Sequence, residues 1–328
     1  MKRVWWALLG FFVLVLAGCG TTTSTQDGAA TGSSGDGAFP VTINTAFGDV
    51  TVKSEPKRVV ALGWGDAETA VALGVQPVGA ADWLAFGGDG LGPWMTQRYT
   101  TAPTILGTLD VNMEQIAALH PDLILDTRAS GQRDRYDQLS KLGVPVVSIP
   151  PGASAYLTSW EQQLDLVGKA LGRTEQAGKL KSGLEAKFTA AAQQHPEFKG
   201  KTVAVGSKTT NGYGGYVNGD GRVELMTKLG FANSPKIQAQ AGDSFSVPVS
   251  SERLDLLDAD LTLIFPIGVT ADSVTADPLF QTIPSVKAGR SIVFSDKTIS
   301  SAMSSATVPG LTYALDKIVP MASSALAH

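Results

Sequence analysis

The spacing of hydrophobic positions along the chain changes near Pro56. Before it, segments 41–44 and 50–52 alternate apolar and polar residues around Phe47-Gly48-Asp49, which predicts a β-hairpin. After it, short apolar runs alternate with stretches of helical spacing, a pattern typical of a mostly parallel sheet with helices on its faces. The expected strands are 59–62, 77–81, 123–125 and 144–149, and the expected helices are 67–73, 114–119 and 133–142.

The same alternation restarts at 201–205 and continues through expected strands 261–265 and 291–294 to a closing helix at 310–326. Between the two series, Gly172 closes one helix, Thr174 is the expected N-cap of the next, and Pro196 ends that helix at His195. One apolar stripe runs along it, made of Ala177, Leu180, Leu184, Phe188 and Ala191.

This long helix has about 22 residues and a length of ~33 Å, about that of a domain. It is either a peripheral helix of a single domain or a rigid bridge between two lobes. The bridge fits better, because the alternation of strands and helices starts afresh after it. The expected fold class is α/β, with two lobes of mostly parallel sheet joined by one long helix.

The N-terminus resembles a bacterial lipoprotein signal. Lys2 and Arg3 precede an apolar run at 4–16, which at about 13 residues is too short to span a bilayer. Leu16-Ala17-Gly18-Cys19 resembles a lipobox, whose cysteine becomes lipid-modified, and Cys19 is the only cysteine of the chain. An ordinary signal peptide with an incidental cysteine is the alternative. Lipid attachment at Cys19 places the protein on the extracytoplasmic face of the cell membrane, because buried acyl chains anchor it there.

Residues 20–38 are nearly all Gly, Thr, Ser, Ala and Asp, which predicts a flexible tether. The expected organisation is therefore a signal peptide at 1–19, a tether at 20–40, an N-terminal lobe at 41–172, a linker helix at 173–196 and a C-terminal lobe at 197–328.

A short repeat links the two halves. Glu114 and Glu252 each precede an apolar residue by two positions, a leucine by five and an aspartate by eight, and a capping residue stands two positions before each, Asn112 or Ser250. Each glutamate should thus lie in the first turn of a helix that leads into a strand, where the helix dipole stabilises a carboxylate. The matched placement favours a shared docking role, although duplication of a structural unit would also produce it.

Composition limits the function. The 328 residues are 43% hydrophobic and 17% charged with a net charge of −4, which fits about two folded domains and argues against nucleic-acid binding. One cysteine excludes an internal disulfide, and three histidines leave little for a protein-built zinc or haem-iron site. His120 and His195 precede prolines at helix ends and His328 is the last residue, so all three are expected to be solvated.

Motifs of catalysis are missing from the sequence. It contains no G-x-S-x-G elbow and no phosphate-binding G-x-x-x-x-G-K loop. Segment 63–68 follows a strand, but Asp66 and Glu68 stand where a dinucleotide's pyrophosphate would lie. Neither an enzyme nor a cofactor is therefore expected.

Candidate ligand contacts follow the expected strands, because ligands of open α/β sheets bind beyond the carboxyl ends of the strands. Flat aromatic side chains and cationic groups are suited to an organic, anionic ligand. Core packing is the alternative for each tryptophan, and Trp160, on a helix, is assigned to the core. The aromatic candidates are Trp64, Trp83, Phe86, Trp94, Tyr213 and Tyr216, and the cationic ones are Arg128 and Lys297.

Four segments carry a specific resemblance: 59–64 (VVALGW), 73–79 (LGVQPVG), 116–124 (IAALHPDLI) and 142–146 (LGVPV). They resemble the ferric-siderophore substrate-binding proteins of ABC importers, a superfamily that also holds cobalamin- and haem-binding proteins. The resemblance covers about residues 41–326 and implies two α/β lobes, a ligand between them and only small hinge motion. It also implies docking on the permease through one glutamate per lobe, at positions that correspond to Glu114 and Glu252.

The expected function is a membrane-tethered monomer that captures an iron–siderophore complex and delivers it to an ABC-transporter permease. The protein would bind the organic chelator and not the iron itself, which agrees with the scarcity of histidine and cysteine. Haem is one alternative, since Tyr213, Tyr216 and Met303 could reach an iron. Cobalamin is a second, and an extracytoplasmic hydrolase on a similar scaffold is a third.

Overall fold

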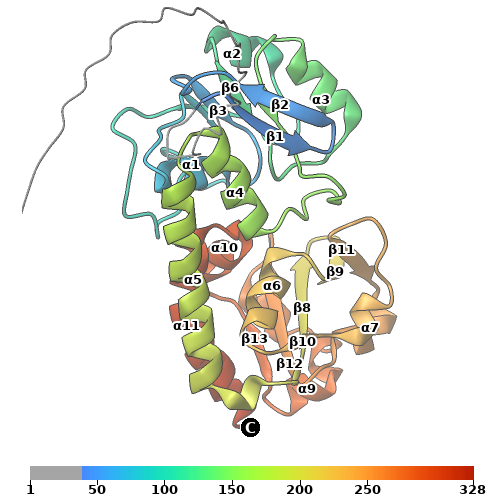
Figure 1. Ribbon diagram of the computed structural model, residues 1–328. Coiled ribbons are helices and arrows are strands. Elements are labelled where there is room, and N and C mark those ends of the chain that lie inside the picture. The colour runs from blue at the N-terminus through green and yellow to red at the C-terminus, as the bar shows by residue number, and fades with distance from the viewer. Residues whose placement is uncertain (1–38) are drawn as a thin grey trace, which may run out of the picture. The chain divides into compact units, whose positions relative to one another are not determined.

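The computed structural model describes residues 39–328 (Figure 1). The expected signal peptide, Cys19 and nearly all of the expected tether lie outside the described residues. Phe39 already packs against the hydrophobic core, so the folded part begins before residue 41. The predicted hairpin is present as β1 (Val41–Thr45) and β2 (Gly48–Val52), paired antiparallel.

The first lobe is built on a five-stranded parallel sheet with the order β5-β4-β3-β6-β7. Its three central strands are fully buried, as expected when helices cover both faces of a parallel sheet. The strands are β3 (Val59–Ala61), β4 (Gly79–Ala81), β5 (Thr104–Leu106), β6 (Leu123–Leu125) and β7 (Val146–Val147), and the helices are α1 (Asp66–Ala72), α2 (Met113–Ala118), α3 (Arg133–Ser140) and α4 (Trp160–Ala170).

The second lobe contains a mixed sheet with the order β11-β9-β8-β12-β13, and β10 also pairs with β8. The strand expected to stop at Val205 continues to Thr209, and the glycine-rich segment 211–216 that follows it contributes a further strand. This correction makes the sheet mixed, since β9 runs antiparallel to both β8 and β11. The strands are β8 (Thr202–Thr209), β9 (Gly212–Tyr216), β10 (Ala232–Asn233), β11 (Ser246–Val249), β12 (Leu261–Pro266) and β13 (Ser291–Val293).

Short helices connect these strands. They are α6 (Gly221–Lys228), α7 (Pro235–Gln238), the 3₁₀ segment η2 (Ser251–Leu257), α8 (Ala271–Thr275), the 3₁₀ segment η3 (Phe280–Thr282) and α9 (Pro284–Lys287). After the last strand, α10 (Lys297–Ser305) leads into the final helix.

Two long helices run beside both sheets (Figure 1). The expected linker helix is α5 (Thr174–Gln194), and a 3₁₀ turn, η1 (Pro196–Phe198), follows it. Thr174 is the first helical residue and not the N-cap, which is Arg173 without a side-chain capping bond. Helix α11 (Val308–Leu326) begins against α1, packs along α5 and ends near β12 and β13.

The two sheets share part of one hydrophobic core. A single cluster of buried residues contains Leu125 of the first sheet, Val205 of the second, Leu184 of α5 and Leu315 of α11. The domain boundaries expected from the sequence stay a prediction, because this packing marks no boundary. Among helices within residues 39–328, none is both long and apolar enough to cross a bilayer.

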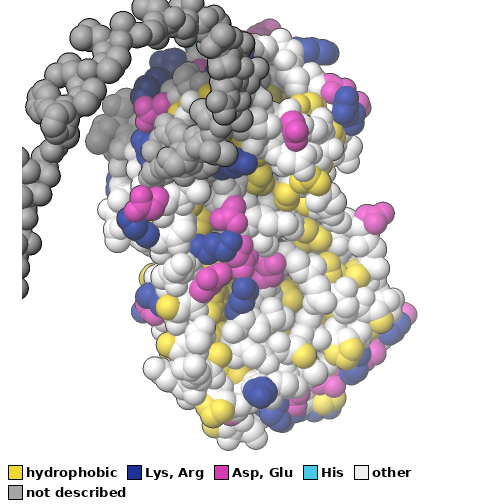
Figure 2. Space-filling model, in the orientation of Figure 1, with side chains coloured by type: hydrophobic (Ala, Val, Ile, Leu, Met, Phe, Trp, Pro, Cys, Tyr) yellow, Lys and Arg dark blue, Asp and Glu magenta, His cyan; other side chains and the backbone are white. Residues whose placement is uncertain are grey.

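Charged side chains also join the lobes. Lys228 of α6 forms an ion pair with Glu161 of α4 at 2.6 Å, and beside it Lys181 of α5 pairs with Asp165 of α4 at 2.8 Å. Figure 2 shows basic and acidic side chains gathered over these helices, with hydrophobic side chains along the surface where the two lobes meet.

Candidate functional site

Loops that follow four neighbouring strands of the first sheet form one side of the candidate site. Trp83 follows β4, Trp64 follows β3, Arg128 follows β6 and Tyr156 follows β7. The loops are bonded to each other, since the Trp64 amide donates to the Arg128 carbonyl at 2.9 Å and the Tyr156 amide to the Ala129 carbonyl at 2.8 Å. The carboxyl edge of the sheet thus brings three of the expected ligand residues together.

Aromatic rings from both lobes meet at this edge. The Trp64 ring lies between Trp83, with centroids 4.3 Å apart, and Tyr156, at 4.2 Å. Phe245, from the segment before β11 in the second lobe, places its ring edge against Trp64 at 5.9 Å and stacks on Tyr216 of β9 at 6.4 Å. These five residues are called the aromatic cluster below. All except Tyr216 are only half-buried, so each of these four side chains is partly open to solvent.

Arg128 is a buried cation beside the aromatic cluster. Its side chain is 3% exposed, and among the described residues it donates only to main-chain carbonyls, to Ser305 at 2.9 Å and to Tyr156 at 3.4 Å. Burial lowers the pKa of Arg128 because it removes water from the guanidinium. Within residues 39–328 no carboxylate lies at ion-pair distance, so the positive charge is suited to an anionic ligand group.

Arg222, at the start of α6, is also buried, but unlike Arg128 it is paired with a carboxylate. Burial opposes its charge, but Asp220 outweighs this and raises the pKa of the guanidinium. Two bonds join the pair, at 2.8 and 2.6 Å, and the guanidinium lies 3.5 Å from the centre of the Tyr216 ring. Arg222 is therefore already neutralised and acts as a support for Tyr216.

Asp66 and Gln163 hold the Trp64 loop in place. The Asp66 carboxylate accepts from the amides of Gly63 at 3.1 Å and Thr127 at 3.0 Å, from the Thr127 hydroxyl, and from Gln163 Nε2 at 2.7 Å. Gln163 Nε2 also donates to the Trp64 carbonyl at 2.8 Å. Burial raises the pKa of Asp66 to about 6. The Gly63 amide donates to Asp66 and the Trp64 amide donates to the Arg128 carbonyl, so neither is left for a phosphate.

A second buried carboxylate, Glu68, links α1 to α11. It accepts from the Gly92 amide at 3.0 Å, the Trp94 indole at 3.2 Å and the Thr307 hydroxyl at 2.6 Å. Burial raises the pKa of Glu68. Thr307 is also the N-cap of α11, since its hydroxyl accepts from the Gly310 amide at 3.2 Å.

Several expected ligand residues lie elsewhere. Trp94 is 8% exposed and packs with Phe86 at 5.3 Å, away from the aromatic cluster, beside a groove of about 420 Å³ that Tyr313 also lines. Tyr213 lies in a separate core cluster of the second lobe, and its hydroxyl donates to Asp277 at 2.7 Å. Lys297 is exposed at the first position of α10.

Sequence reasoning missed Tyr156 and Phe245. Tyr156 could have been found, because it follows the expected strand 144–149 in the same way that Trp64 follows its own strand. Phe245 had no such signal, since it precedes a strand that the pattern does not reveal. Trp160, assigned to the core, is 2% exposed as expected.

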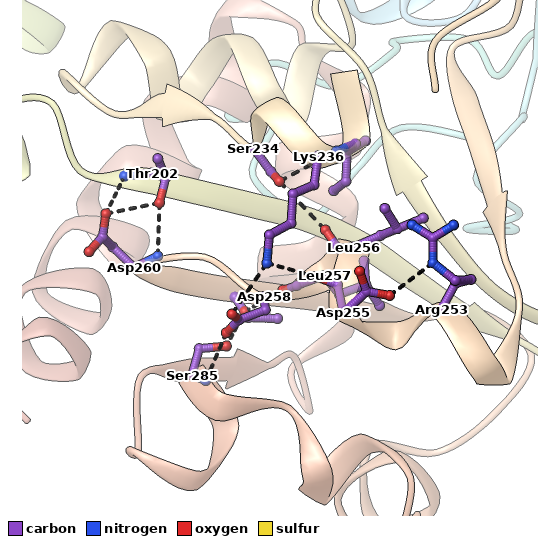
Figure 3. Close-up of polar contacts among 12 residues, drawn as sticks. Thr202, Ser234, Lys236, Arg253, Asp255, Leu256, Leu257, Asp258, Asp260 and Ser285 are labelled. Atoms are coloured by element: carbon purple, nitrogen blue, oxygen red, sulfur yellow. Dashed lines mark hydrogen bonds and ion pairs between the residues drawn. The ribbon is translucent and has the colours of Figure 1, made fainter. Parts of the chain in front are cut away.

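The two repeat glutamates are both exposed, but their local structures differ. Glu114 lies in the first turn of α2, where the Asn112 side chain accepts from the Gln115 amide at 3.0 Å. Glu252 lies in η2, a 3₁₀ segment interrupted at Arg253, and Ser250 makes no capping bond. The expected capped helix is therefore confirmed at Glu114 and wrong at Glu252. Figure 3 shows the polar contacts that hold η2 in its place.

The repeat corresponds to the same connection in both lobes. Asp122 accepts from the amides of Lys57 at 2.8 Å and Arg58 at 2.9 Å, directly before β3. Asp260 accepts from the Thr202 amide at 2.8 Å, at the start of β8. Each aspartate thus fastens the strand it begins to the neighbouring central strand. The matching aspartates are explained by structure, whereas the exposed glutamates are not.

Metal-ligating side chains do not gather in the described part of the chain. Within residues 39–328 no three His, Cys, Asp or Glu side chains are grouped so that they could hold a metal ion. The chemistry of the candidate site is therefore that of aromatic faces, an indole N–H and a buried guanidinium.

Comparison with known proteins identifies the fold. The model of a family described as periplasmic binding protein matches residues 59–298, which is most of the chain. The chain belongs to the periplasmic binding protein family. The resemblance of the strand motifs to this family and the expected fold class are confirmed.

Relatives of this periplasmic binding protein include two from Bacillus subtilis. YvrC, an ABC transporter substrate-binding lipoprotein, is 29% identical over 53% of either chain, so the match spans about half of that protein's length. YfiY, named a probable siderophore-binding lipoprotein, is 23% identical over 93% of either chain. Among solved structures, the iron uptake ABC transporter substrate-binding protein PiaA of Streptococcus pneumoniae has a TM-score of 0.72 at 25% identity, over 88% of this chain and 99% of PiaA.

Proposed function

We propose that this protein is an extracytoplasmic, lipid-anchored monomer that binds a ferric siderophore between its lobes and delivers it to an ABC-transporter permease. One observation carries the proposal: aromatic rings from both lobes meet beside the buried Arg128, which has no ion-pair partner among residues 39–328. The family supports a binding protein over a hydrolase. The names of YfiY and PiaA support an iron chelate as the ligand class.

The chemistry of the aromatic cluster suits the outside of a chelate. A siderophore wraps iron in anionic oxygens and presents an organic surface with flat, apolar parts. Trp83 and Tyr156, which lie on either side of Trp64, offer flat faces, and Arg128 offers a planar fork of donors for carboxylate or hydroxamate oxygens. The protein would then contact the chelator and leave the coordination of the iron unchanged.

Trp64 adds a specific polar contact. Its indole Nε1 is buried and has no hydrogen-bond partner within residues 39–328. A buried donor without an acceptor costs about 1–3 kcal/mol, and a ligand oxygen within reach would remove that cost. The rings of the aromatic cluster touch each other, so a chelate must replace some of these ring contacts as it enters.

Haem is less well supported. The Tyr213 hydroxyl already donates to Asp277, and Met303 is fully buried. Using these side chains as iron ligands would require breaking that bond or opening the core. Tyr216 lies in the aromatic cluster, but the guanidinium of Arg222 covers its ring.

Docking on the permease is assigned to Glu114 and Glu252. Both carboxylates are exposed, one on each lobe, and among the described contacts neither has a hydrogen bond or an ion pair. Lipid attachment at Cys19 would keep the protein near the permease. YvrC and YfiY, both named lipoproteins, support this location.

Ligand titration tests the proposal. Ferrichrome, a tris-catecholate iron chelate, ferric citrate, haemin and cyanocobalamin are each added to the purified protein while tryptophan fluorescence is followed. We expect at least one iron chelate to bind at micromolar concentration or below. No response to any iron chelate, or tighter binding of haemin or cyanocobalamin, would refute the siderophore assignment.

A pair of variants tests the place of binding. Trp64→Ala removes the central ring of the stack. We expect it to reduce the binding free energy of the chelate by about 2 kcal/mol, which corresponds to a roughly thirtyfold weaker affinity. Trp160→Phe is the control, because the buried Trp160 indole N–H also has no partner in the described part of the chain and Trp160 lies in the core. Equal affinities of the Trp64→Ala protein and the unaltered protein would place the ligand elsewhere.

A further inference from the structure

The segments that carry the exposed glutamates are both too short to be stable alone. Helix α2 has six residues and η2 has seven, whereas isolated helices need about 12–15 residues to persist in water. Their positions must therefore come from contacts with the rest of each lobe. The carbonyls of the C-terminal end have no partners inside a helix, so they need partners from the rest of the lobe.

In the first lobe these carbonyls are bound by an arginine. Arg58, directly before β3, donates from Nη2 to the Leu119 carbonyl at 2.6 Å, and from Nε to the same carbonyl at 2.8 Å and to His120 at 3.1 Å. Leu119 is the C-cap of α2. The guanidinium thus closes the end of the helix and adds a positive charge where the helix dipole favours one.

In the second lobe a lysine takes the corresponding place. Lys236 of α7 donates from Nζ to the Asp255 carbonyl at 3.2 Å and reaches the Asp258 carboxylate at 3.5 Å (Figure 3). Asp258 is the C-cap of η2 and also accepts from the Ser285 amide at 3.0 Å. The ammonium therefore ties η2 to α7 and, through Asp258, to the start of α9.

We infer that Arg58 and Lys236 are positioning residues for docking, each holding the segment that presents one docking glutamate. The inference rests on the proposed function of Glu114 and Glu252. Neither cation belongs to the aromatic cluster, so ligand binding does not require them. Without its cation each segment frays, and the glutamate must be ordered again whenever the protein meets the permease.

The two clamps differ in strength. Arg58 makes three contacts of 2.6–3.1 Å to two carbonyls, whereas Lys236 makes two contacts of 3.2 and 3.5 Å. Segment η2 has additional support from the Thr262 hydroxyl, which donates to the Leu257 carbonyl at 2.7 Å. Loss of Arg58 should therefore impair docking more than loss of Lys236.

The test uses the full chain in its own cells after deletion of the chromosomal copy. Uptake of iron-55 is measured with ferrichrome, the tris-catecholate chelate or ferric citrate, whichever binds in the titration. Arg58→Met should reduce the initial rate about three- to tenfold, since a hydrogen bond to a charged group is lost at the docking segment. Lys236→Met should reduce it by less, and Arg58→Lys should restore part of the rate.

Matched controls separate this effect from a general loss of charge. Lys57→Met removes a neighbouring cation that pairs with Glu55, and Lys201→Met removes one that faces Asp260 at 3.7 Å. Both should leave uptake unchanged. Chelate affinity should be the same in all variants, while amide hydrogen exchange should rise within 115–120 in the Arg58→Met protein.

Each outcome decides one point. Normal uptake in Arg58→Met cells, together with lost uptake in Glu114→Ala cells, would overturn the positioning role and leave docking intact. Unchanged uptake in cells with both Glu114→Ala and Glu252→Ala would refute the docking function itself. Weaker chelate binding by the Arg58→Met protein would show that Arg58 acts on the ligand site and would also overturn the inference.

Discussion

The buried carboxylate of Asp66 allows a sharp test of how the ligand loop is held. In Asp66→Asn, the amide oxygen can replace the oxygen that accepts from the Gly63 and Thr127 amides. The amide nitrogen then faces Gln163 Nε2, so one donor meets another. An unsatisfied buried donor costs about 1–3 kcal/mol, which is the expected loss of unfolding free energy at pH 7.5.

The pH dependence follows from the raised pKa of Asp66. Burial raises this pKa from its ordinary 3.8 to about 6, so the folded state holds the proton more tightly than the unfolded chain does. The stabilising contribution of the proton is complete below pH 3.8 and is lost as the pH rises through 6. Between pH 7.5 and pH 5 it amounts to roughly 1 kcal/mol, and asparagine has no such contribution.

Urea unfolding followed by tryptophan fluorescence measures this difference at the two pH values. The gap in unfolding free energy between the unaltered protein and Asp66→Asn should be roughly 1 kcal/mol wider at pH 5 than at pH 7.5. Asp243→Asn, at an exposed aspartate, is the control and should differ by less than about 0.5 kcal/mol at both. If the difference in unfolding free energy stays constant or narrows at pH 5, the pKa of Asp66 is not raised. The hydrogen-bond donors around Asp66, which lower its pKa, would then outweigh the effect of burial.

Two further changes test the links described above. Thr307→Ala removes the N-cap of α11 and a donor to the buried Glu68. This should lower the unfolding free energy, measured by urea unfolding, by about 2–4 kcal/mol. A loss below about 1 kcal/mol would show that the contact between Thr307 and Glu68 is unimportant. Arg128→Met should weaken binding of an anionic chelate about tenfold or more in the fluorescence titration, because a buried charge-assisted bond is lost. Unchanged affinity would exclude Arg128 from the site.

Much of the first lobe could be predicted because its signals are local. Strands 59–61, 79–81 and 123–125 are fully buried, so they stand out as apolar runs between helices. The long helix was equally visible, because Gly172 and Pro196 mark its ends. The rule that ligands bind beyond strand ends then selected Trp64, Trp83 and Arg128 correctly as neighbours.

The remaining features depend on contacts between distant segments. Strand β9 contains three glycines and reads as a loop, yet it pairs with β8 and β11 along its whole length. Trp94 follows a strand at some distance, but Glu68 accepts from its indole and draws it into the core. The inward orientation of Trp94 thus depends on its contact with the buried Glu68, which the spacing of residues along the chain does not predict.

The corner between α10 and α11 has a consequence for protein engineering. Thr307 lies in the C-terminal part of the chain, yet its hydroxyl donates to the carboxylate of Glu68 in α1, in the N-terminal lobe. The final helix then runs back along α5 toward β13. A chimera joined after residue 196 would thus give the first lobe a foreign closing helix. In a chimera of two relatives, residues 307–328 should therefore come from the same parent protein as the N-terminal lobe.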